Sequence, residues 1–163
     1  MPLTPKPASD SATEMVQVVL PNDANPLGFI LGGTVMHLID IAGAIACHRH
    51  TRRRVVTAAV DDLQFLHSIK VGDLIILKAR VTCTFTTSLE VKVDVYSEET
   101  LTGTRLLTSR AFLTFVAIDA EGGRVPVPPL VIDTDEERRV SREAHARRAQ
   151  RLKRRSETRS ASA

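Results

Sequence analysis

The chain has 163 residues and a mass of 17.9 kDa, which fits one domain rather than two. Hydrophobic residues make up 43% of it and charged residues 25%, so burial can offset chain entropy and wholesale disorder is excluded. Aromatic residues make up only 4%, with no Trp, which argues against a stacking platform for single-stranded nucleic acid.

The formal net charge of +3 is concentrated at the C-terminal end. Residues 133–163 hold ten Lys and Arg against six Asp and Glu, whereas the residues before them hold 12 against 13. The basic character belongs to the tail, so we expect no nucleic-acid partner. Residues 1–13 contain no apolar run, and no stretch reaches the roughly 18 apolar residues that span a bilayer. We therefore expect a cytoplasmic protein with neither signal peptide nor membrane span.

The two cysteines, Cys47 and Cys83, are too few and too far apart for a zinc cage or a disulfide framework. We expect buried free thiols in a reducing compartment. His48 and His50 beside Cys47 invite a metal interpretation, but histidines two residues apart point to different faces of a helix. We therefore expect no metal ion and no cofactor.

The predicted elements begin after a loose N-terminal segment, residues 1–12. A short strand is predicted at residues 15–20. Residues 33–48 are apolar on nearly every helical face, which predicts a core helix surrounded by other elements. Thr34 or the glycines before it would start this helix, and the cations of residues 49–54 would close it.

Further strands are predicted at residues 54–62, 73–85, 89–96 and 104–119. Alternation in the second of these predicts one buried face made of Ile75, Leu77, Ala79, Val81, Cys83 and Phe85. Thr86 and Thr87 form a short turn into the next strand, which gives an antiparallel hairpin. The order predicts an α+β fold with an antiparallel sheet wrapped around a long central helix.

Three prolines within residues 126–129 exclude a regular helix or central strand, so we expect the core domain to span residues 13–125. Residues 126–163 then form a Pro-rich break and a charged helical tail, with Thr134 or Asp133 as the cap. The few apolar side chains of this helix do not form a continuous apolar face: Val140, Ala144, Ala146 and Leu152. We expect it to lie solvated on the surface and to fray at its end.

Asp40 is the residue that most needs an explanation, because it lies in the middle of the apolar helix. A carboxylate there is costly unless it is paired or lines a cavity. Carboxyl groups in apolar surroundings often act as catalytic acids or bases. The alternative is a structural Asp bound to a backbone amide or to an Arg, and spacing alone leaves both interpretations open.

The loop of residues 25–34 runs into that helix and contains Gly28, Gly32 and Gly33. Glycines let the backbone approach a ligand closely, and free N–H groups at a helix N-terminus can hold a carbonyl oxygen or an oxyanion. The alternative is a tight turn that needs positive φ. Neither a phosphate-cradling Gly motif nor a Gly-x-Ser-x-Gly elbow is present, which disfavours nucleotide hydrolysis and serine-hydrolase chemistry.

Five motifs follow one another along the chain: NPLG at 25–28, GG at 32–33, DIAGAI at 40–45, VVTAAVDDLQF at 55–65 and IKVGD at 69–73. Together they resemble the hotdog-fold acyl-CoA thioesterases of the cytosolic, brown-fat-inducible type. The likeness covers about residues 20–119. A set of linked motifs in this order is far more specific than any one of them.

The resemblance implies hydrolysis of acyl-CoA to a free acid and CoA. Asp40 would act as general base or nucleophile, Asn25 would match the loop Asn, and the amide of Gly33 would polarise the thioester carbonyl. The substrate would contact further residues: Gly32, Phe65, Thr86, Thr87 and Ser88. The resemblance also implies a homodimer with a shared, twelve-stranded layer, assembled further into a hexamer.

Dehydratases and hydratases of the same fold use a His with a carboxylate, and the loop that begins at Asn25 has no His. His37, three residues before Asp40, is interpreted as an interface or packing residue. A second hypothesis is a non-catalytic module that binds or senses acyl-CoA. A nucleic-acid binder that uses the basic tail is a third, disfavoured by its mixed charge.

Overall fold

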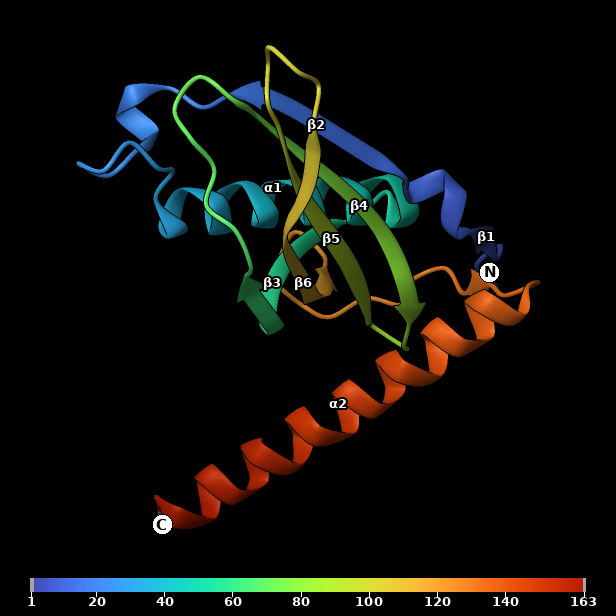
Figure 1. Cartoon of the computed structure of the whole chain (residues 1–163). Helices are drawn as coiled ribbons and strands as arrows, with labels where there is room; N and C mark the ends of the chain where they lie inside the picture. Colours follow the sequence, from blue (N-terminus) through green and yellow to red (C-terminus); the bar gives the residue numbers. More distant parts are fainter. Residues whose placement is uncertain (1, 163) are drawn as a thin grey trace.

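Five strands form an antiparallel sheet in the order β2-β4-β5-β6-β3 in the computed structural model, which describes residues 2–162 (Figure 1). The strands are β2 (Thr13–Val18), β3 (Arg54–Phe65), β4 (Leu74–Thr84), β5 (Ser88–Glu98) and β6 (Arg105–Ile118). The other elements are a parallel pair, β1 (Lys6–Pro7) with β7 (Leu130–Val131), the helices α1 (Gly32–Thr51) and α2 (Asp135–Ala161), and 3-10 turns at Ala8–Ser11 and Pro21–Asp23. The predicted α+β fold is confirmed.

Helix α1 packs along the inner face of the sheet, which curls around it (Figure 1). Gly43 makes this packing possible, because a Cβ at that position would lie 3.0 Å from the Phe115 ring. The helix is longer than the predicted residues 33–48, and the residue that caps its C-terminus, Arg52, has a left-handed conformation with φ of 53°. Met36 stays 47% exposed, so within one chain the sheet covers only one side of the helix.

The alternation predicted for β4 holds for its first four apolar residues, Ile75, Leu77, Ala79 and Val81. It is wrong for Cys83 and Phe85, because the register with β5 shifts between Val81 and Cys83. Such a bulge turns the side chains that follow it to the other face. There the Cys83 sulfur lies 3.7 Å from the Ser141 hydroxyl, and Phe85 packs edge-on against His145. Both cysteines are free and buried, as predicted.

The N-terminal segment that was expected to be loose is anchored to the sheet. The Ser11 side chain is fully buried, donates a 2.6 Å hydrogen bond to the Ala8 carbonyl and accepts one of 2.9 Å from the Val81 N–H. Its hydroxyl thus satisfies a backbone amide beside the β4 bulge. The Lys6–Pro7 strand pairs with Leu130–Val131 in a separate two-stranded sheet. The main sheet of one chain therefore has five strands, not the six per chain that a twelve-stranded dimer requires.

Thr134, one of the two predicted caps, is the N-cap of α2, with a capping box completed by Glu137. It is not solvated along its whole length, because its first half lies on the outer face of the sheet. Ala144 is fully buried there, and Arg147 binds the buried Glu90 carboxylate through two hydrogen bonds of 2.8 and 2.9 Å. Further along α2, Arg151 still contacts β3 through a 2.6 Å hydrogen bond to Asp61, and only the C-terminal end of the helix stands clear of the sheet in Figure 1.

The sheet ends in two open edges, β2 and β3. Strand β3 pairs only with β6 and leaves three apolar side chains about half exposed, Val56, Val60 and Phe65. An open apolar edge is a ready template for pairing with a second chain. In the described part of the chain, neither α-helix combines the length and apolar composition needed to cross a bilayer.

Candidate active site

Asp40 lies where α1 meets β3, on the half-exposed side of the helix. Its Oδ1 accepts a 2.6 Å hydrogen bond from the Thr57 hydroxyl. The partner is therefore a hydroxyl and neither the backbone amide nor the Arg of the structural alternative. Thr57 lies inside the motif of residues 55–65 but was not singled out there, since a β-branched residue is common in a strand. A register shift directly after Thr57 bends β3 at this point.

Asn25 organises the loop in front of α1. Its Oδ1 accepts hydrogen bonds from the N–H groups of Leu27 and Phe29, at 3.0 and 3.2 Å, and its own N–H donates to the Phe29 carbonyl. Gly28 closes this turn with φ of 82°, so the structural alternative for the glycines applies to Gly28. These contacts occupy the side-chain carbonyl oxygen and leave the NH₂ group of Asn25 for a ligand.

The N-terminus of α1 is open. Leu31 is the N-cap residue and no side chain caps the first turn, so the first N–H groups of the helix are free to bind an acceptor. A Cβ added at Gly33 would meet nothing within 4 Å, which shows open space beside this amide. The Leu31 N–H donates to the Asp23 carbonyl at 2.8 Å and so holds the helix start in place.

Gly32 and Phe65 are brought together at this end of the molecule. The tip of the Phe65 ring lies 3.6 Å from the position that a Cβ of Gly32 would take. Both line a pocket of about 190 Å³, together with apolar side chains that include Ile30, Val35 and Ile69. The pocket also has polar lining residues, which include His67 and Thr108, so the structure joins two of the predicted substrate contacts in one small pocket of mixed character.

The predicted contacts Thr86, Thr87 and Ser88 lie at the turn between β4 and β5. Ser88 stands opposite Val116 of β6, which stands opposite Val56 of β3. Neighbouring strands are about 4.8 Å apart, so this turn begins about 10 Å from the β3 segment that carries Thr57.

One chain alone does not assemble these groups into a single site. Gly33 precedes Asp40 by seven residues in α1, which corresponds to about 10.5 Å along the helix. One thioester carbonyl cannot contact both, because reacting atoms must approach within roughly 3 to 3.5 Å. The predicted catalytic groups therefore form two separate sets. One is the Asp40 carboxylate with Thr57, and the other is the Gly33 amide with the Asn25 loop.

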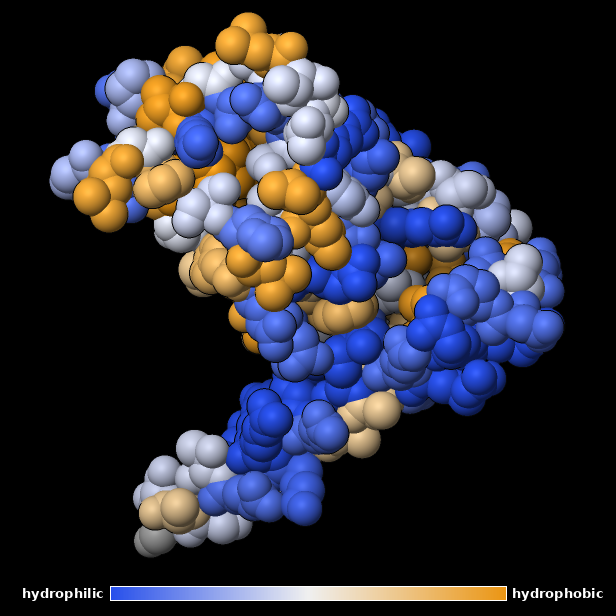
Figure 2. Space-filling model, in the orientation of Figure 1, coloured by the Kyte–Doolittle hydropathy of each residue, from blue (hydrophilic) through white to orange (hydrophobic). Residues whose placement is uncertain are grey.

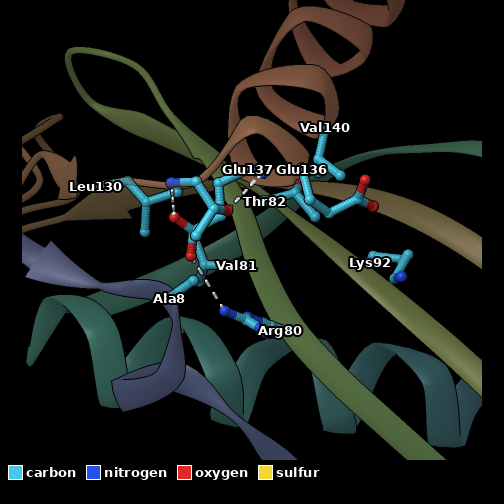
Figure 3. Close-up of a pocket in the computed structure, with 10 residues that line it drawn as sticks. Ala8, Arg80, Val81, Thr82, Lys92, Leu130, Glu136, Glu137 and Val140 are labelled. Atoms are coloured by element: carbon cyan, nitrogen blue, oxygen red, sulfur yellow. Dashed lines mark hydrogen bonds and ion pairs between the residues drawn. The ribbon is translucent and has the colours of Figure 1, made fainter. Parts of the chain in front are cut away.

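A second hollow, shown in Figure 3, lies between the Ala8–Ser11 turn, β4 and the start of α2. Its volume is about 340 Å³. Its charged groups are already paired: Arg80 with Glu137 at 3.5 Å, Lys92 with Asp94 at 3.5 Å, and Glu136 with Arg139. Hydrogen bonds from the N–H groups of residues 133 and 134 lower the pKa of the Glu137 carboxyl below its usual value. This hollow offers little free charge to a ligand.

The histidines near Cys47 contact backbone carbonyl groups. One ring nitrogen of His50 lies 2.9 Å from the Pro128 carbonyl oxygen, and one of His48 lies 2.9 Å from that of Arg53. Among residues 2–162, no three side chains of His, Cys, Asp or Glu gather closely enough to hold a metal ion.

Residues 27–104 match the sequence model of the thioesterase superfamily. The chain is 44% identical over 119 residues to the uncharacterized acyl-CoA thioester hydrolase YkhA of Bacillus subtilis, covering 73% of this chain and 69% of that protein. It is 34% identical over 149 residues to the human cytosolic acyl coenzyme A thioester hydrolase, covering 89% of this chain. The match spans only 39% of the length of the human protein.

Solved structures agree with these likenesses. An apo-hexameric acyl-CoA thioesterase has a TM-score of 0.88 and 43% identity, covering 93% of this chain and 97% of that one. An acyl-CoA hydrolase of Staphylococcus aureus, solved with butyryl-CoA, CoA and CoA disulfide, has a TM-score of 0.87 and 34% identity, covering 96% and 95%. The same enzyme has been solved with alanine in place of one Asn, one Asp or one Thr. The chain belongs to the thioesterase superfamily, among its hotdog-fold acyl-CoA thioester hydrolases.

Proposed function

We propose that this chain hydrolyses acyl-CoA to a free carboxylic acid and CoA, with Asp40 as its catalytic carboxylate. The observation that carries the proposal is the Asp40 carboxylate held by the Thr57 hydroxyl at 2.6 Å. The Asn, Asp and Thr that were replaced in the S. aureus hydrolase are separated by the same intervals as Asn25, Asp40 and Thr57 here. We therefore add Thr57 to Asn25 and Asp40 in the proposed catalytic site.

In the proposed reaction Asp40 takes a proton from a water molecule, whose oxygen attacks the thioester carbonyl carbon. The carbonyl oxygen becomes an oxyanion, which the N–H of Gly33 at the open helix N-terminus of a second copy of the chain stabilises. The C–S bond then breaks, and the CoA sulfur leaves as a thiolate that takes up the proton. The same geometry also permits direct attack by the Asp40 carboxylate, followed by hydrolysis of the resulting anhydride.

The remaining predicted residues are proposed to bind the substrate. Gly32 and Phe65 line the small pocket beside the helix start, and its apolar side would hold part of the acyl chain. The turn Thr86–Ser88 would hold the pantetheine arm, because it lies two strands from Thr57. Asn25 offers its NH₂ group to the thioester or to the attacking water.

We further propose that the enzyme is a homodimer, assembled into a hexamer as trimer of dimers. The open β3 edge and the separation of Gly33 from Asp40 support a dimer, and a similar thioesterase is hexameric. The likeness to the human cytosolic hydrolase supports a cytoplasmic location and the specific cytosolic, brown-fat-inducible type. Residues 13–125 remain the proposed extent of the hotdog unit.

A panel of acyl-CoA substrates of rising chain length, assayed with a thiol reagent for released CoA, tests the proposal. We expect turnover that is saturable in acyl-CoA and lost in Asp40→Asn. Tight binding of acyl-CoA without any thiol release would instead support the alternative, a non-catalytic acyl-CoA-binding module.

A further inference from the structure

The small pocket beside the start of α1 contains a buried polar group that the proposed reaction does not use. It is the hydroxyl of Ser109, a residue of β6 that lines the pocket and is only 1% exposed. Within residues 2–162 no hydrogen bond involves this hydroxyl, whereas that of its neighbour Thr108 donates to the Val95 carbonyl at 3.0 Å. Buried hydroxyl groups are nearly always hydrogen-bonded, so the Ser109 side chain calls for a ligand.

Strand pairing places Ser109 on the side of the sheet that faces α1. Ser109 stands opposite Phe65 of β3, and directly paired residues of antiparallel strands have their Cβ atoms about 5 Å apart on the same face. The Phe65 ring in turn lies beside Gly32 at the start of the helix. Further along β6, Ala111 and Leu113 continue the same row and belong to the hydrophobic core. Ser109 is therefore a polar exception in an apolar row.

A β-bulge directly before Ser109 fixes this orientation. The register of β5 with β6 shifts after Val95, which leaves Thr108 as an extra residue in β6. The Thr108 hydroxyl is used by Val95, and its carbonyl accepts a 2.7 Å hydrogen bond from the Leu66 N–H. Bulges are common next to active sites, where they aim a side chain. The polar groups of Thr108 are thus satisfied within the chain, and the Ser109 hydroxyl is left for a ligand.

Apolar side chains accompany this polar group at the surface. In Figure 2, hydrophobic residues gather toward the upper left of the visible face, whereas hydrophilic residues dominate α2 below them. Phe65 and its neighbour Leu66 are both 52% exposed, and Leu31, directly before the helix, is 43% exposed. His67 and Ser68 add polar side chains to the pocket lining. An acyl chain can therefore enter along apolar groups and meet hydrogen-bonding groups inside.

The pocket has room for a small part of a substrate. At about 30 Å³ for each non-hydrogen atom, the share of a water molecule in the liquid, its volume of about 190 Å³ holds about six such atoms. An unsubstituted hydrocarbon chain there would leave the Ser109 hydroxyl without a partner, which is costly. A chain that carries an oxygen would satisfy it, because a serine hydroxyl can donate to an oxo group and can both donate to and accept from a hydroxyl.

We propose that Ser109 makes the pocket selective for acyl groups that carry a hydroxyl or oxo group on the chain. The inference rests on the proposed function, because it assigns a substrate preference to the same site. Enzyme sites that hydrogen-bond a group of the substrate discriminate against the analogue that lacks it, since the protein group is then left unpaired. A water molecule that stays bound to Ser109 beside every substrate would abolish this preference, and the test is designed to detect that outcome.

The test compares Ser109→Ala with Ser97→Ala in the full chain. Ser97 is a matched control, because it is also buried, lies on the neighbouring strand β5 and does not line the pocket. The substrates are four- and six-carbon acyl-CoAs, each paired with analogues hydroxylated at C3 or at the terminal carbon. For the better hydroxylated analogue, we expect wild-type kcat/KM to exceed that of the unsubstituted substrate about fivefold. Ser109→Ala should abolish this advantage, and Ser97→Ala should keep it within about twofold.

Binding measurements separate this preference from catalysis. Calorimetry on Asp40→Asn, with and without Ser109→Ala, gives the Kd of the same substrate pairs without turnover. The hydroxylated ligand should bind more tightly only where Ser109 is present. If the wild type hydrolyses none of the substrates, the proposed hydrolysis fails and the Kd comparison still tests Ser109. The inference is overturned if no hydroxylated substrate is favoured, or if the two serine variants change the preference equally.

Discussion

The Thr57 hydroxyl donates a 2.6 Å hydrogen bond to Asp40 Oδ1 across the contact between β3 and α1. A hydroxyl that donates to a carboxylate at this length forms a charge-assisted bond, which fixes the carboxylate more firmly than a neutral partner would. Within residues 2–162 no other side chain or backbone donor binds this carboxylate. Its second oxygen is therefore open to water or to a thioester.

Replacing Asp40 by Asn removes the base and keeps the shape of the side chain. We expect kcat for acyl-CoA hydrolysis to fall at least about a hundredfold, the low end for losing a positioned acid–base group. The circular dichroism spectrum and the Tm should remain close to those of the wild type. Turnover near the wild-type rate in the purified variant would remove Asp40 from the mechanism.

Thr57→Val keeps the β-branched shape in β3 and deletes the donor to Asp40. We expect kcat to fall about tenfold with little change in KM, because the carboxylate loses its orientation and not its charge. Thr57→Ser retains a hydroxyl and should recover most of the rate. If valine and serine lower kcat equally, the hydroxyl is not what matters at this position.

The sequence predicted those features that depend on periodicity along one segment. The hydrophobic run around Asp40 predicted the inner helix, and the alternation from Ile75 to Val81 predicted a half-buried strand. The loop that Asn25 organises was found because Asn, Pro and Gly have distinct turn chemistry. These signals are local, so one sequence is enough to detect them.

What the sequence could not predict depends on partners far along the chain. Glu90 alternates with buried residues like any solvent-facing strand residue, and only the docked helix buries it under Arg147. The β4 bulge leaves no mark on composition, so Cys83 was assigned to the wrong face. Thr57 was not singled out because its partner, Asp40, is 17 residues away in the sequence and lies on another element.

The docking of α2 predicts a large effect of Arg147→Ala. Glu90 would remain in a site where its side chain is only 2% exposed and would lose two hydrogen bonds. We expect the free energy of unfolding to fall by about 3 kcal/mol in denaturant titrations.

Arg138→Ala is the matched control, because it breaks an ion pair with Asp135, whose side chain is almost fully exposed. It should cost less than about 1 kcal/mol. Adding Glu90→Gln to Arg147→Ala should restore part of the lost stability, since it removes the unpaired charge. Equal losses in Arg147→Ala and Arg138→Ala would show that the buried pair does not anchor the helix.

His50 predicts a loss of stability in mild acid. Burial lowers the pKa of its imidazole from the usual 6.5, the hydrogen bond to the Pro128 carbonyl raises it in part, and the nearby charges of Lys6 and Asp10 have opposing effects. The unfolded chain therefore takes up a proton near pH 6.5 that the folded chain does not accept, so stability falls as the pH drops below that value.

His50→Gln keeps an N–H donor and cannot titrate, so it separates this residue from the other ionisable groups. Between about pH 7.5 and about pH 5.5, the Tm of the wild type should drop a few degrees more than that of the variant. Parallel curves for the two proteins would assign the acid sensitivity to other groups.

The separation of Gly33 from Asp40 along α1 predicts that the active site forms between two chains. If the carboxylate comes from one chain and the amide with the Asn25 loop from its partner, each two-fold dimer contains two such sites. Asp40→Asn and Asn25→Ala are then each inactive alone, because every site lacks one half. A mixed dimer would contain one site with both halves intact and one site with neither.

Co-refolding equal amounts of the two variants tests this arrangement. Random pairing makes about half of the dimers mixed, and each has one working site of two, so activity should recover to roughly a quarter of the wild type. Subunit exchange is verified by tagging the two variants differently and isolating the doubly tagged dimers, which should carry all of the recovered activity. If these dimers are no more active than the average of the separate variants, Asp40 and Asn25 act within one chain.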